Sequence, residues 1–518
     1  MANKYTVYFS FLFLLLLTLT RCTPSSGPEV PENEYQVTIS KSDMRMLHVE
    51  AILNVAEKEL SMDWPAANSV EKGWAHFVEN LEVHDLDGDL VPTEYQDKAT
   101  WKLETNTDRV RVSYDLHVTH DEIDWIEGGH SASAYLVEHT LYLIGAALFI
   151  ATPTEIMIGA GPPTTVRFDL PEGFKVVTPW SNSELEPDAF MVQSTYELVR
   201  SALLIGVIEF QELNVQGMEI DIATAPDFKE AIPLFQSIYT EIVPAAQAYF
   251  GDVKKAKYVV IANKAPRTEA FEPYFSGEAL HQSMSIISPI VPTEEFMPMF
   301  WYILTHEYIH IWNGITIQFA DEEESAWFLE GFTDYIAWDL LHRLGEITDE
   351  VMLNGNEIAG FNFGWNENIK KYLAVAGKIS LREAGAAKQD NYDLIYSGGA
   401  LFALILDIKM NDATNGKVGL KTFMRALNKQ YGNAGARLLS YADIKELAFD
   451  LSGVHVDTLF EDYVNGKSII PVGEYLEKAG LKMENMGTPD QKIILDPQAT
   501  EKQGMVLHAV CGIGGKVE

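Results

Sequence analysis

Cysteine is almost absent from this chain, which carries only Cys22 and Cys511 among its 518 residues. The chain can therefore form one internal disulfide at most, and none if Cys22 carries a lipid. Cysteine content thus says nothing about the redox compartment, and an argument for export has to come from the N-terminal segment.

Basic side chains are also scarce. The chain has 38 lysines and arginines against 75 aspartates and glutamates, which gives a formal net charge of −37. Because so acidic a surface repels phosphate backbones, nucleic acid is excluded as a partner class. Hydrophobic residues make up 47% of the chain and charged residues 22%, as in globular proteins, and the length of 518 residues suggests two or three domains.

The N-terminal apolar run, Phe9 to Leu19, has eleven residues and is too short for a comfortable transmembrane helix. Because it follows Lys4, it predicts a secretory signal peptide over residues 1–22. Cys22 resembles a bacterial lipoprotein cleavage site, although Arg21 stands where a small residue is usual. An ordinary signal peptide and an uncleaved anchor are the alternatives.

Residues 23–34 are rich in proline, serine and glycine, a composition that predicts a flexible tether. We therefore expect an exported protein that is periplasmic, secreted, displayed at the cell surface or held at the membrane as a lipoprotein. The N-terminal lipid or signal anchor is the only membrane contact that we expect.

Residues 35–222 predict a β-sandwich-like domain. Apolar and polar residues alternate without a break from Val110 to Val118, as in a half-buried strand. The stretch from Asp85 to Val91 predicts a turn and then a strand. Its acidic residues resemble a calcium loop, but no glutamate stands at the twelfth position, so a solvated hairpin turn is favoured. No internal repeat is evident.

After Asp227 the apolar residues follow a helical period, which predicts a second domain and a boundary near residues 222–227. A buried strand is expected at 257–262. Helices are expected at 230–250, 298–313 and 324–345, and within 396–431 and 440–451.

The chemistry of the second half centres on His306, Glu307 and His310. On a helix, histidines four residues apart lie on one face, one turn apart. Two imidazoles in this arrangement can hold zinc without a rearrangement of the chain. Glu307 follows the first histidine, and its carboxylate can take a proton from a metal-bound water at the open coordination position.

Chance alone produces a His-Glu-x-x-His match in a chain this long with a frequency on the order of a few per cent. The flanking residues raise its significance, because Trp301 to Leu304 and Ile311 to Trp312 predict a buried helix. Two histidines and a glutamate in such a helix cost free energy unless something binds them.

A catalytic zinc needs a third protein ligand, and Glu330 is the candidate. It lies twenty residues after His310, on the next predicted helix, so the chain has room to turn back toward the same metal. Asp334 lies one helical turn later and is placed to accept a hydrogen bond from a ligand histidine. The acidic run at 321–324 is closer in sequence, but it predicts a solvated loop and helix start.

These residues resemble the glycyl aminopeptidase family, the sixty-first family of metallopeptidases, which belongs to the gluzincins. The sharpest similarity spans residues 301–340, and the Trp312-Asn313 pair is a specific mark of the family. The similarity extends over residues 35–481. Further blocks that resemble the family lie at 396–401, 404–407, 414–416 and 471–481.

The resemblance implies an α+β multidomain fold, in which a β-sandwich-like domain precedes a thermolysin-like, mainly helical zinc peptidase domain. We expect the catalytic region at 225–370, its C-terminal helical part at 371–481 and a tail at 482–518. It also implies zinc as the cofactor and Asn313 as a residue around the metal ligands. Tyr396, one of 22 tyrosines, is expected to donate a hydrogen bond to the oxyanion of the tetrahedral intermediate.

The chain departs from the family pattern in three places. Leu280 stands where a glutamate usually binds the free amino group of the substrate, although His281 matches and Glu278 lies on the same strand face as Leu280. The segment that begins at Tyr396 lacks the lysine of the usual Tyr-x-Lys-Gly pattern. Only 37 residues follow Leu481, so the PDZ domain of the family is expected to be absent or truncated.

We therefore expect a zinc-dependent peptidase that acts on peptide substrates, and the resemblance implies an aminopeptidase that releases N-terminal glycine and alanine. Leu280 motivates an alternative, a zinc endopeptidase. A second alternative is a surface-anchored binding protein with a catalytically silent zinc site, although the presence of Glu307 argues against it.

Overall fold

The computed structural model describes residues 32–514. Within this range it leaves out residues 63, 65–66, 68–69, 124, 126–130, 153–160, 184–185, 187–188, 252–256, 266–274, 359–360 and 433–436. The predicted signal peptide, Cys22 and most of the predicted tether lie outside the described residues, so export and lipid attachment stay predictions. None of the helices formed by the described residues combines the length and the apolar character needed to span a bilayer.

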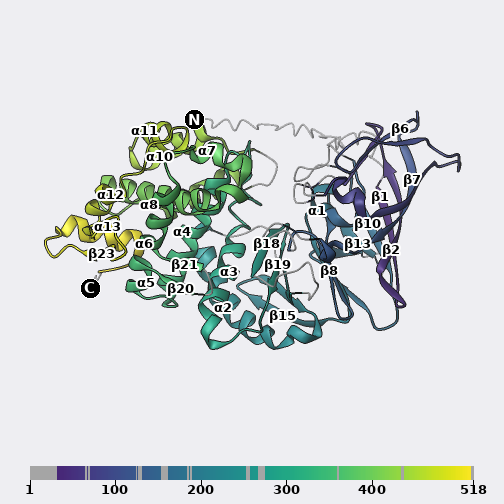
Figure 1. The fold of residues 1–518 in the computed structure, drawn as a ribbon, viewed down its shortest axis with the longest axis horizontal. Coiled ribbons are helices and arrows are strands. Elements are labelled where there is room, and N and C mark those ends of the chain that lie inside the picture. Colours follow the sequence, from purple (N-terminus) through teal and green to yellow (C-terminus); the bar gives the residue numbers. More distant parts are fainter. Residues whose placement is uncertain are drawn as a thin grey trace, which may run out of the picture. The chain divides into compact units, whose positions relative to one another are not determined.

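The N-terminal region consists of two main sheets that share one hydrophobic core (Figure 1). The first has the order β12-β13-β10-β1-β2-β7-β4 and the second has the order β11-β14-β9-β8. Val37, Val112, Leu143 and Leu204 come from both sheets and pack in the same buried cluster. The prediction of a β-sandwich-like first domain is confirmed.

The strands of the first sheet are β1 (Asn33–Ser40), β2 (Asp43–Asn54), β4 (Val78–Asp85), β7 (Arg109–His117), β10 (Thr164–Asp169), β12 (Ser181–Asn182) and β13 (Ala189–Val192). Those of the second are β8 (Ala134–Val137), β9 (Thr140–Ile144), β11 (Lys175–Val177) and β14 (Ala202–Gly206). A smaller sheet has the order β3-β6-β5 and contains β3 (Glu59–Ser61), β6 (Thr100–Leu103) and β5 (Thr93–Tyr95).

Two local predictions in this region agree with the structure. Strand β7 covers the alternating stretch, with Val110 and Val112 buried and the residues between them more exposed. The acidic stretch after β4 is a turn, in which the carboxylate of Asp85 accepts hydrogen bonds from the backbone N–H groups of Asp87 and Asp89. The bridge between His84 and Leu90 makes it a hairpin turn.

A third sheet has the order β15-β16-β17-β19-β18 and carries the functional site. Its strands are β15 (Glu209–Val215), β16 (Met218–Thr224), β17 (Lys257–Lys264), β18 (Ser276–Leu280) and β19 (Ser283–Ser288). We predicted that residues up to 222 belong to the first domain. Strand pairing shows otherwise, because β16 pairs in parallel with β17, and the chain leaves the second sheet after Gly206. An isolated hairpin has the same alternating pattern in either sheet, so the sequence pattern does not distinguish the two.

The third sheet is buried on both faces. Tyr258 and Val260 face the helical core, whereas Val259 and Ile261 pack in the core of the N-terminal sheets. A hydrogen bond of 3.1 Å from Asn263 Nδ2 to the Tyr135 hydroxyl oxygen links the sheets across this contact. Strand β18 forms one edge of the third sheet.

The second half is mainly helical, as predicted. Helix α2 spans Ile232–Phe250, α3 spans Met297–Ile309 and α4 spans Ala326–Leu344. Helix α3 ends four residues earlier than we predicted, with His310 as its C-terminal cap, and α4 ends at Gly345, whose φ of 84° is left-handed.

Helix α8 (Tyr392–Thr414) lies against α4 along a close crossing. A Cβ atom added to Gly331 of α4 would lie 2.4 Å from the Cα atom of Gly399 in α8, so glycine is required there. Further elements of this half are α5 (Asp349–Asn354), β20 (Asn356–Ile358), β21 (Phe361–Phe363), α6 (Trp365–Val375), α7 (Leu381–Ala384), α9 (Leu420–Tyr431), α10 (Tyr441–Ser452), α11 (Asp457–Leu459) and α12 (Val472–Lys478), whereas the short helix α1 (Thr195–Val199) lies in the N-terminal region between β13 and β14.

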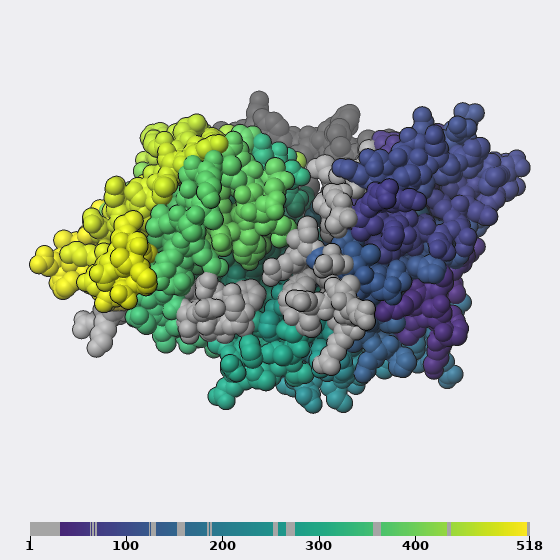
Figure 2. All heavy atoms as spheres, in the orientation of Figure 1, coloured from purple at the N-terminus to yellow at the C-terminus, as the bar shows by residue number. Residues whose placement is uncertain are grey.

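The predicted tail is folded over its described part. It forms the hairpin β22 (Leu481–Glu484) and β23 (Lys492–Leu495), followed by α13 (Glu501–Cys511). Figure 2 shows these residues, in yellow, lying against the green helices. Asn366 of α6 donates a 2.7 Å hydrogen bond to the Gln491 carbonyl oxygen, and both side chains are buried. The absence of a PDZ domain stays a prediction.

Candidate active site

Side-chain atoms of His306, His310 and Glu330 converge in the interior of the helical half, within 4.8 Å of one another. The Nε2 atoms of the two histidines are 3.1 Å apart, and Glu330 Oε2 lies 3.3 Å from His306 Nε2 and 3.5 Å from His310 Nε2. Ligands of a tetrahedral zinc ion lie roughly 3.3 Å apart, given metal–ligand distances of about 2.0–2.1 Å. The structure therefore brings together the three residues that we predicted as metal ligands.

The buried position of α3 holds the two histidines in place. His306 and Glu307 are 5% and 8% exposed, and the neighbouring Tyr308 is fully buried. At the end of the helix, Trp312 stacks on Phe250 of α2 at 4.9 Å between ring centroids. Tyr308 also packs edge-on against Tyr258 of β17 at 5.4 Å between ring centroids, so aromatic contacts hold α3 against both the third sheet and α2.

Hydrogen bonds to the far ring nitrogens fix the tautomers of both histidines. His306 Nδ1 lies 2.8 Å from Asp334 Oδ1, and His310 Nδ1 lies 2.9 Å from the Asn313 carbonyl oxygen. Because each Nδ1 keeps its proton for these bonds, each Nε2 is the nitrogen that can exchange a proton for a metal ion at the common point.

The residues that hold the two histidines, Asp334 and Asn313, have hydrogen-bond partners of their own. Asp334 also accepts a 2.5 Å hydrogen bond from the Tyr302 hydroxyl, a partner that sequence analysis missed. The amide nitrogen of Asn313 donates to Thr333 Oγ1 at 3.0 Å and to the carbonyl oxygen of Leu329 at 3.0 Å. Asn313 therefore ties the end of α3 to α4, which carries Glu330 and Asp334.

Lys388 pairs with the third predicted ligand. Its Nζ lies 2.5 Å from Glu330 Oε1 and 5.6 Å from the ring centroid of Tyr396. Burial raises the pKa of Glu330, but Lys388 and the two histidines together hold it well below its usual value. Lys388, from the segment just before α8, is therefore a neighbour of both Glu330 and Tyr396 that no sequence motif indicated.

The charges around His306 Nε2, His310 Nε2 and Glu330 Oε2 favour a cation between these three atoms. Burial lowers the pKa of His306, but its hydrogen bonds to Asp334 and Glu330 outweigh burial and raise the pKa to about 10. The surroundings of this imidazole therefore favour positive charge at that point. Two neutral imidazole nitrogens and one carboxylate oxygen form a donor set that zinc prefers, so the residues fit this metal.

Glu307 lies between the three predicted ligands and the edge strand β18. A Cβ atom added to Gly277 of β18 would lie only 2.5 Å from Glu307 Oε1, so glycine lets the strand approach the carboxylate closely. Burial raises the pKa of Glu307, and His306 and His310 oppose the rise. A raised pKa suits a carboxylate that accepts a proton and then releases it.

Tyr396 lies on α8 and faces the site. Its ring is nearly parallel to the His306 ring at 6.2 Å between centroids and stacks on Tyr392 at 4.1 Å. Burial and the nearby carboxylate of Glu330 raise the pKa of Tyr396 well above its usual value. The phenol therefore keeps its proton and can donate a hydrogen bond.

The two predicted substrate-binding residues lie in different surroundings. Burial and the neighbouring Glu307 raise the pKa of Glu278 to about 7, and Glu330 and Lys388 also act on it, so Glu278 belongs to the charged site. His281 instead lies beside Glu197, at 3.5 Å, and away from the predicted ligands. Leu280, which replaces the expected acid, is buried in the apolar cluster that contains Val259.

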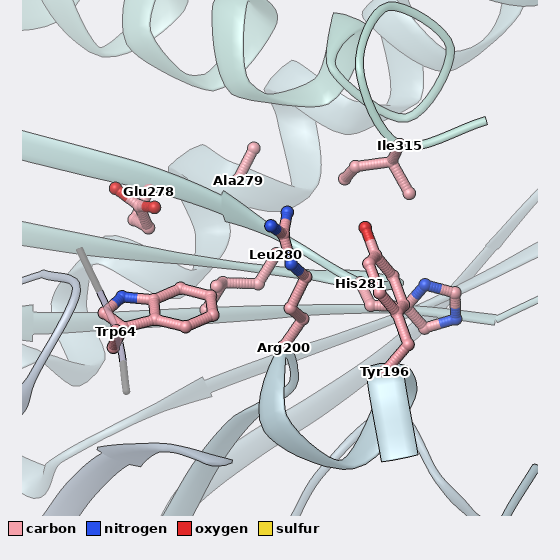
Figure 3. Close-up of a pocket in the computed structure, with 8 residues that line it drawn as sticks. All are labelled: Trp64, Tyr196, Arg200, Glu278, Ala279, Leu280, His281 and Ile315. Atoms are coloured by element: carbon pink, nitrogen blue, oxygen red, sulfur yellow. The ribbon is translucent and has the colours of Figure 1, made fainter. Parts of the chain in front are cut away.

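A pocket extends along β18 from Glu278 toward the N-terminal region (Figure 3). Ile315, in the loop after His310, lines it on one side, and Trp64 and Tyr196 line it on the other. Figure 3 shows Arg200 between the rings of Trp64 and Tyr196. Arg200 was not predictable as a pocket residue from the sequence, because its neighbours in the chain carry no motif.

Family models match two ranges of the chain. The peptidase M61 N-terminal domain matches residues 34–207, and the M61 glycyl aminopeptidase domain matches residues 299–401. The N-terminal match ends where the chain leaves the second sheet, just after β14. The second contains His306, His310, Glu330 and Tyr396. Among curated proteins, none matches the chain.

Solved structures share the fold. An aminopeptidase N family protein from Idiomarina loihiensis is 17% identical, with a TM-score of 0.69, and the match covers 87% of this chain and 79% of that one. An M1 zinc metallopeptidase from Deinococcus radiodurans is 14% identical, with a TM-score of 0.56, and the match covers 86% of this chain and 95% of that one.

The two family models describe consecutive parts of one kind of peptidase and together span more than half of the sequence. The convergent histidines and glutamate, the adjacent Glu307 and the shared fold agree with them. The chain belongs to the M61 family of glycyl aminopeptidases and is a zinc metallopeptidase.

Proposed function

We propose that this zinc metallopeptidase is an aminopeptidase that releases small N-terminal residues, glycine and alanine among them. The observation that carries the proposal is Glu278, a carboxylate on the edge strand β18 directly after Gly277, whose backbone lies against Glu307. A substrate lying along β18 would place its free ammonium group against this carboxylate, one residue from the backbone of Gly277, which faces Glu307.

The reaction is hydrolysis, in which water adds to the scissile carbonyl carbon and the bond to the leaving amine breaks. Zinc held by His306, His310 and Glu330 would polarise that carbonyl and make the attacking water more acidic. Glu307 accepts a proton from the attacking water and delivers it to the leaving amine. Tyr396 donates a hydrogen bond to the carbonyl oxygen as negative charge develops there, an interaction worth about 3 to 4 kcal/mol of barrier in comparable sites.

One observation favours an endopeptidase as the second candidate. Leu280 occupies the position where the family carries the acid that recognises the amine, and it is only 3% exposed, so no carboxylate can stand there. If Glu278 does not take over this role, the site has no means of selecting a free N-terminus. The two candidates predict opposite responses to blocked peptides.

The test compares glycyl and alanyl para-nitroanilides with their N-acetylated forms. We expect zinc-dependent release of nitroaniline from the free-amine substrates only. Glu307→Gln should lower kcat by about three orders of magnitude or more while the zinc content stays unchanged, because the base is lost and the ligands are kept. Comparable hydrolysis of the N-acetylated substrates would establish the endopeptidase, and zinc binding without hydrolysis of any substrate would establish the silent binding protein.

Glu278→Gln tests, in the same assay, whether Glu278 recognises the free amino group of the substrate. Loss of the charged partner should lower kcat/KM for alanyl nitroanilide by about 10- to 100-fold. Glu212→Gln is the matched control, since Glu212 is an exposed glutamate on β15 at the opposite edge of the same sheet. Equal kinetics in the two variants would remove Glu278 from amine recognition.

A further inference from the structure

Arg200 stands out in a chain with twice as many acidic as basic residues. Its side chain is 34% exposed, its ion-pair partner is Glu322 at 3.8 Å, which is itself 68% exposed, and its uncharged neighbour is the Tyr196 side chain. So long a contact between two solvated groups contributes little to stability. A guanidinium with so weak a partner, inside a pocket that leads to the site, has the capacity to bind a further anion.

The fold holds Arg200 rigidly at the end of the edge strand. Its carbonyl oxygen accepts a 2.7 Å hydrogen bond from the backbone N–H of His281, the residue directly after β18. Its guanidinium carbon lies 5.3 Å from the ring centroid of Trp64 and 4.9 Å from that of Tyr196. Aromatic contacts of this kind order a guanidinium while its planar fork of N–H donors stays suited to a carboxylate.

The pocket of Figure 3 thus contains one anion and one cation, Glu278, which follows the glycine that lies against Glu307, and Arg200. A ligand that satisfies both carries an ammonium group and a carboxylate. The α-carboxyl of an N-terminal residue is tied up in the scissile peptide bond, so its free carboxylate can only be that of its side chain.

We infer that Arg200 forms a subsite for an acidic side chain, and that peptides with N-terminal aspartate or glutamate are substrates in addition to those with small residues. This inference rests on the proposed function, since it takes Glu278 as the partner of the amine. Arg200 is then a specificity-determining residue, because its fork is placed to bind the carboxylate of the first residue through two hydrogen bonds.

The alternative is a purely structural role, in which Arg200 only joins Trp64, Tyr196 and the end of β18. Substrate isosteres separate the two roles. Glutamyl and glutaminyl para-nitroanilides differ in charge and hardly in size. A change in the structure of the protein should therefore affect the hydrolysis of both substrates alike. In the wild-type protein, kcat/KM for the glutamyl substrate should exceed that for the glutaminyl one by about 10- to 100-fold.

The variants Arg200→Gln and Arg200→Lys complete the test. The glutamyl-to-glutaminyl ratio should fall to about one in Arg200→Gln and to an intermediate value in Arg200→Lys, which keeps the charge and loses the fork. Arg437→Gln is the matched control, since Arg437 also lies against a tyrosine ring, 4.8 Å from the centroid of Tyr431. A wild-type ratio near one, or an unchanged ratio in Arg200→Gln, would overturn the inference.

A binding measurement keeps this inference separable from the proposed function. Calorimetric titration of zinc-loaded Glu307→Gln with L-glutamate and with L-glutamine should show about 10-fold or tighter binding of glutamate, lost in the double variant with Arg200→Gln. If no nitroanilide is hydrolysed but this preference holds, the proposed function fails and the subsite stands. If glycyl nitroanilide is hydrolysed and glutamate binds no better than glutamine, the subsite fails and the proposed function stands.

Discussion

At the scale of single residues, the site is determined by which nitrogen of each histidine carries a proton. His306 is held by a carboxylate, Asp334, whereas His310 is held by a backbone carbonyl oxygen, that of Asn313. A carboxylate partner makes the imidazole a stronger donor to a metal than a carbonyl partner does. The two predicted ligand histidines are therefore unequal, and His306 should respond more strongly to changes around it.

Asp334→Asn should weaken zinc binding by about 10- to 100-fold, because His306 loses a charged partner while its own side chain is unchanged. Competition with a zinc chelator measures the affinity. Asp412→Asn is the control, since Asp412 lies on α8 and pairs with a surface lysine, Lys502. Equal zinc affinity of the two variants would show that Asp334 does not support the ligand.

At the scale of secondary-structure elements, helices α4 and α8 supply several residues of the site. Helix α4 supplies Glu330 and Asp334, and α8 supplies Tyr396. The helices are also joined by Asp407 of α8, which accepts a 2.7 Å hydrogen bond from the Tyr335 hydroxyl of α4 and another of 2.7 Å from the backbone N–H of Leu420. Asp407 therefore lies at the junction of three helices, α4, α8 and α9.

Burial raises the pKa of Asp407 to about 7, against hydrogen bonds that lower it. Because its pKa is higher in the folded than in the unfolded chain, the folded state binds the extra proton at intermediate pH. The stabilisation by this proton is complete below the pKa that Asp407 has in the unfolded chain. It is lost as the pH rises to about 7, which lowers the free energy of unfolding by up to roughly 4 kcal/mol.

Asp407→Asn should therefore flatten the decline of thermal stability between about pH 4 and about pH 7. Melting temperatures of the metal-free variant and wild type, measured over this range, test the expectation. Asp450→Asn is the control, because Asp450 is exposed on α10. A wild-type decline that persists in Asp407→Asn would assign the pH dependence to other groups.

At the scale of the whole molecule, negative charge sets the response to metal. The chain has a net charge of −37, and Glu278, Glu307, Glu330 and Asp334 lie together inside it. Among the described residues, the cationic groups that face these carboxylates are the two histidines, Lys388 and, in the pocket of Glu278, Arg200. Loading with zinc should therefore stabilise the fold as well as the chemistry.

Zinc at about a thousandfold excess over its dissociation constant should stabilise the folded chain by about 4 kcal/mol, and chelation should reverse the gain. Glu307→Gln should keep this increase in melting temperature, because Glu307 is not a ligand, whereas Glu330→Gln should lose most of it. Differential scanning fluorimetry measures both. Equal increases in the two variants would argue against Glu330 as the third ligand.

The sequence by itself determined the centre of the site, because its features are local. A spacing of four residues on one helix places His306 and His310 on the same face, and one further turn relates Glu330 to Asp334. The alternating strands of the first half and the helical period of the second were predictable for the same reason, and so was the order of the two regions.

Only the tertiary structure decided which residues complete the site. Lys388 reaches Glu330 across 58 positions of the chain, and Tyr302 reaches Asp334 across 32. Arg200 and Trp64 meet Glu278 in one pocket although they lie in different parts of the sequence. The placement of β15 and β16 in the third sheet likewise depends on parallel pairing with β17. Periodicity reports which way a residue faces along its own element, whereas these contacts depend on how separate elements pack, and no local pattern specifies that.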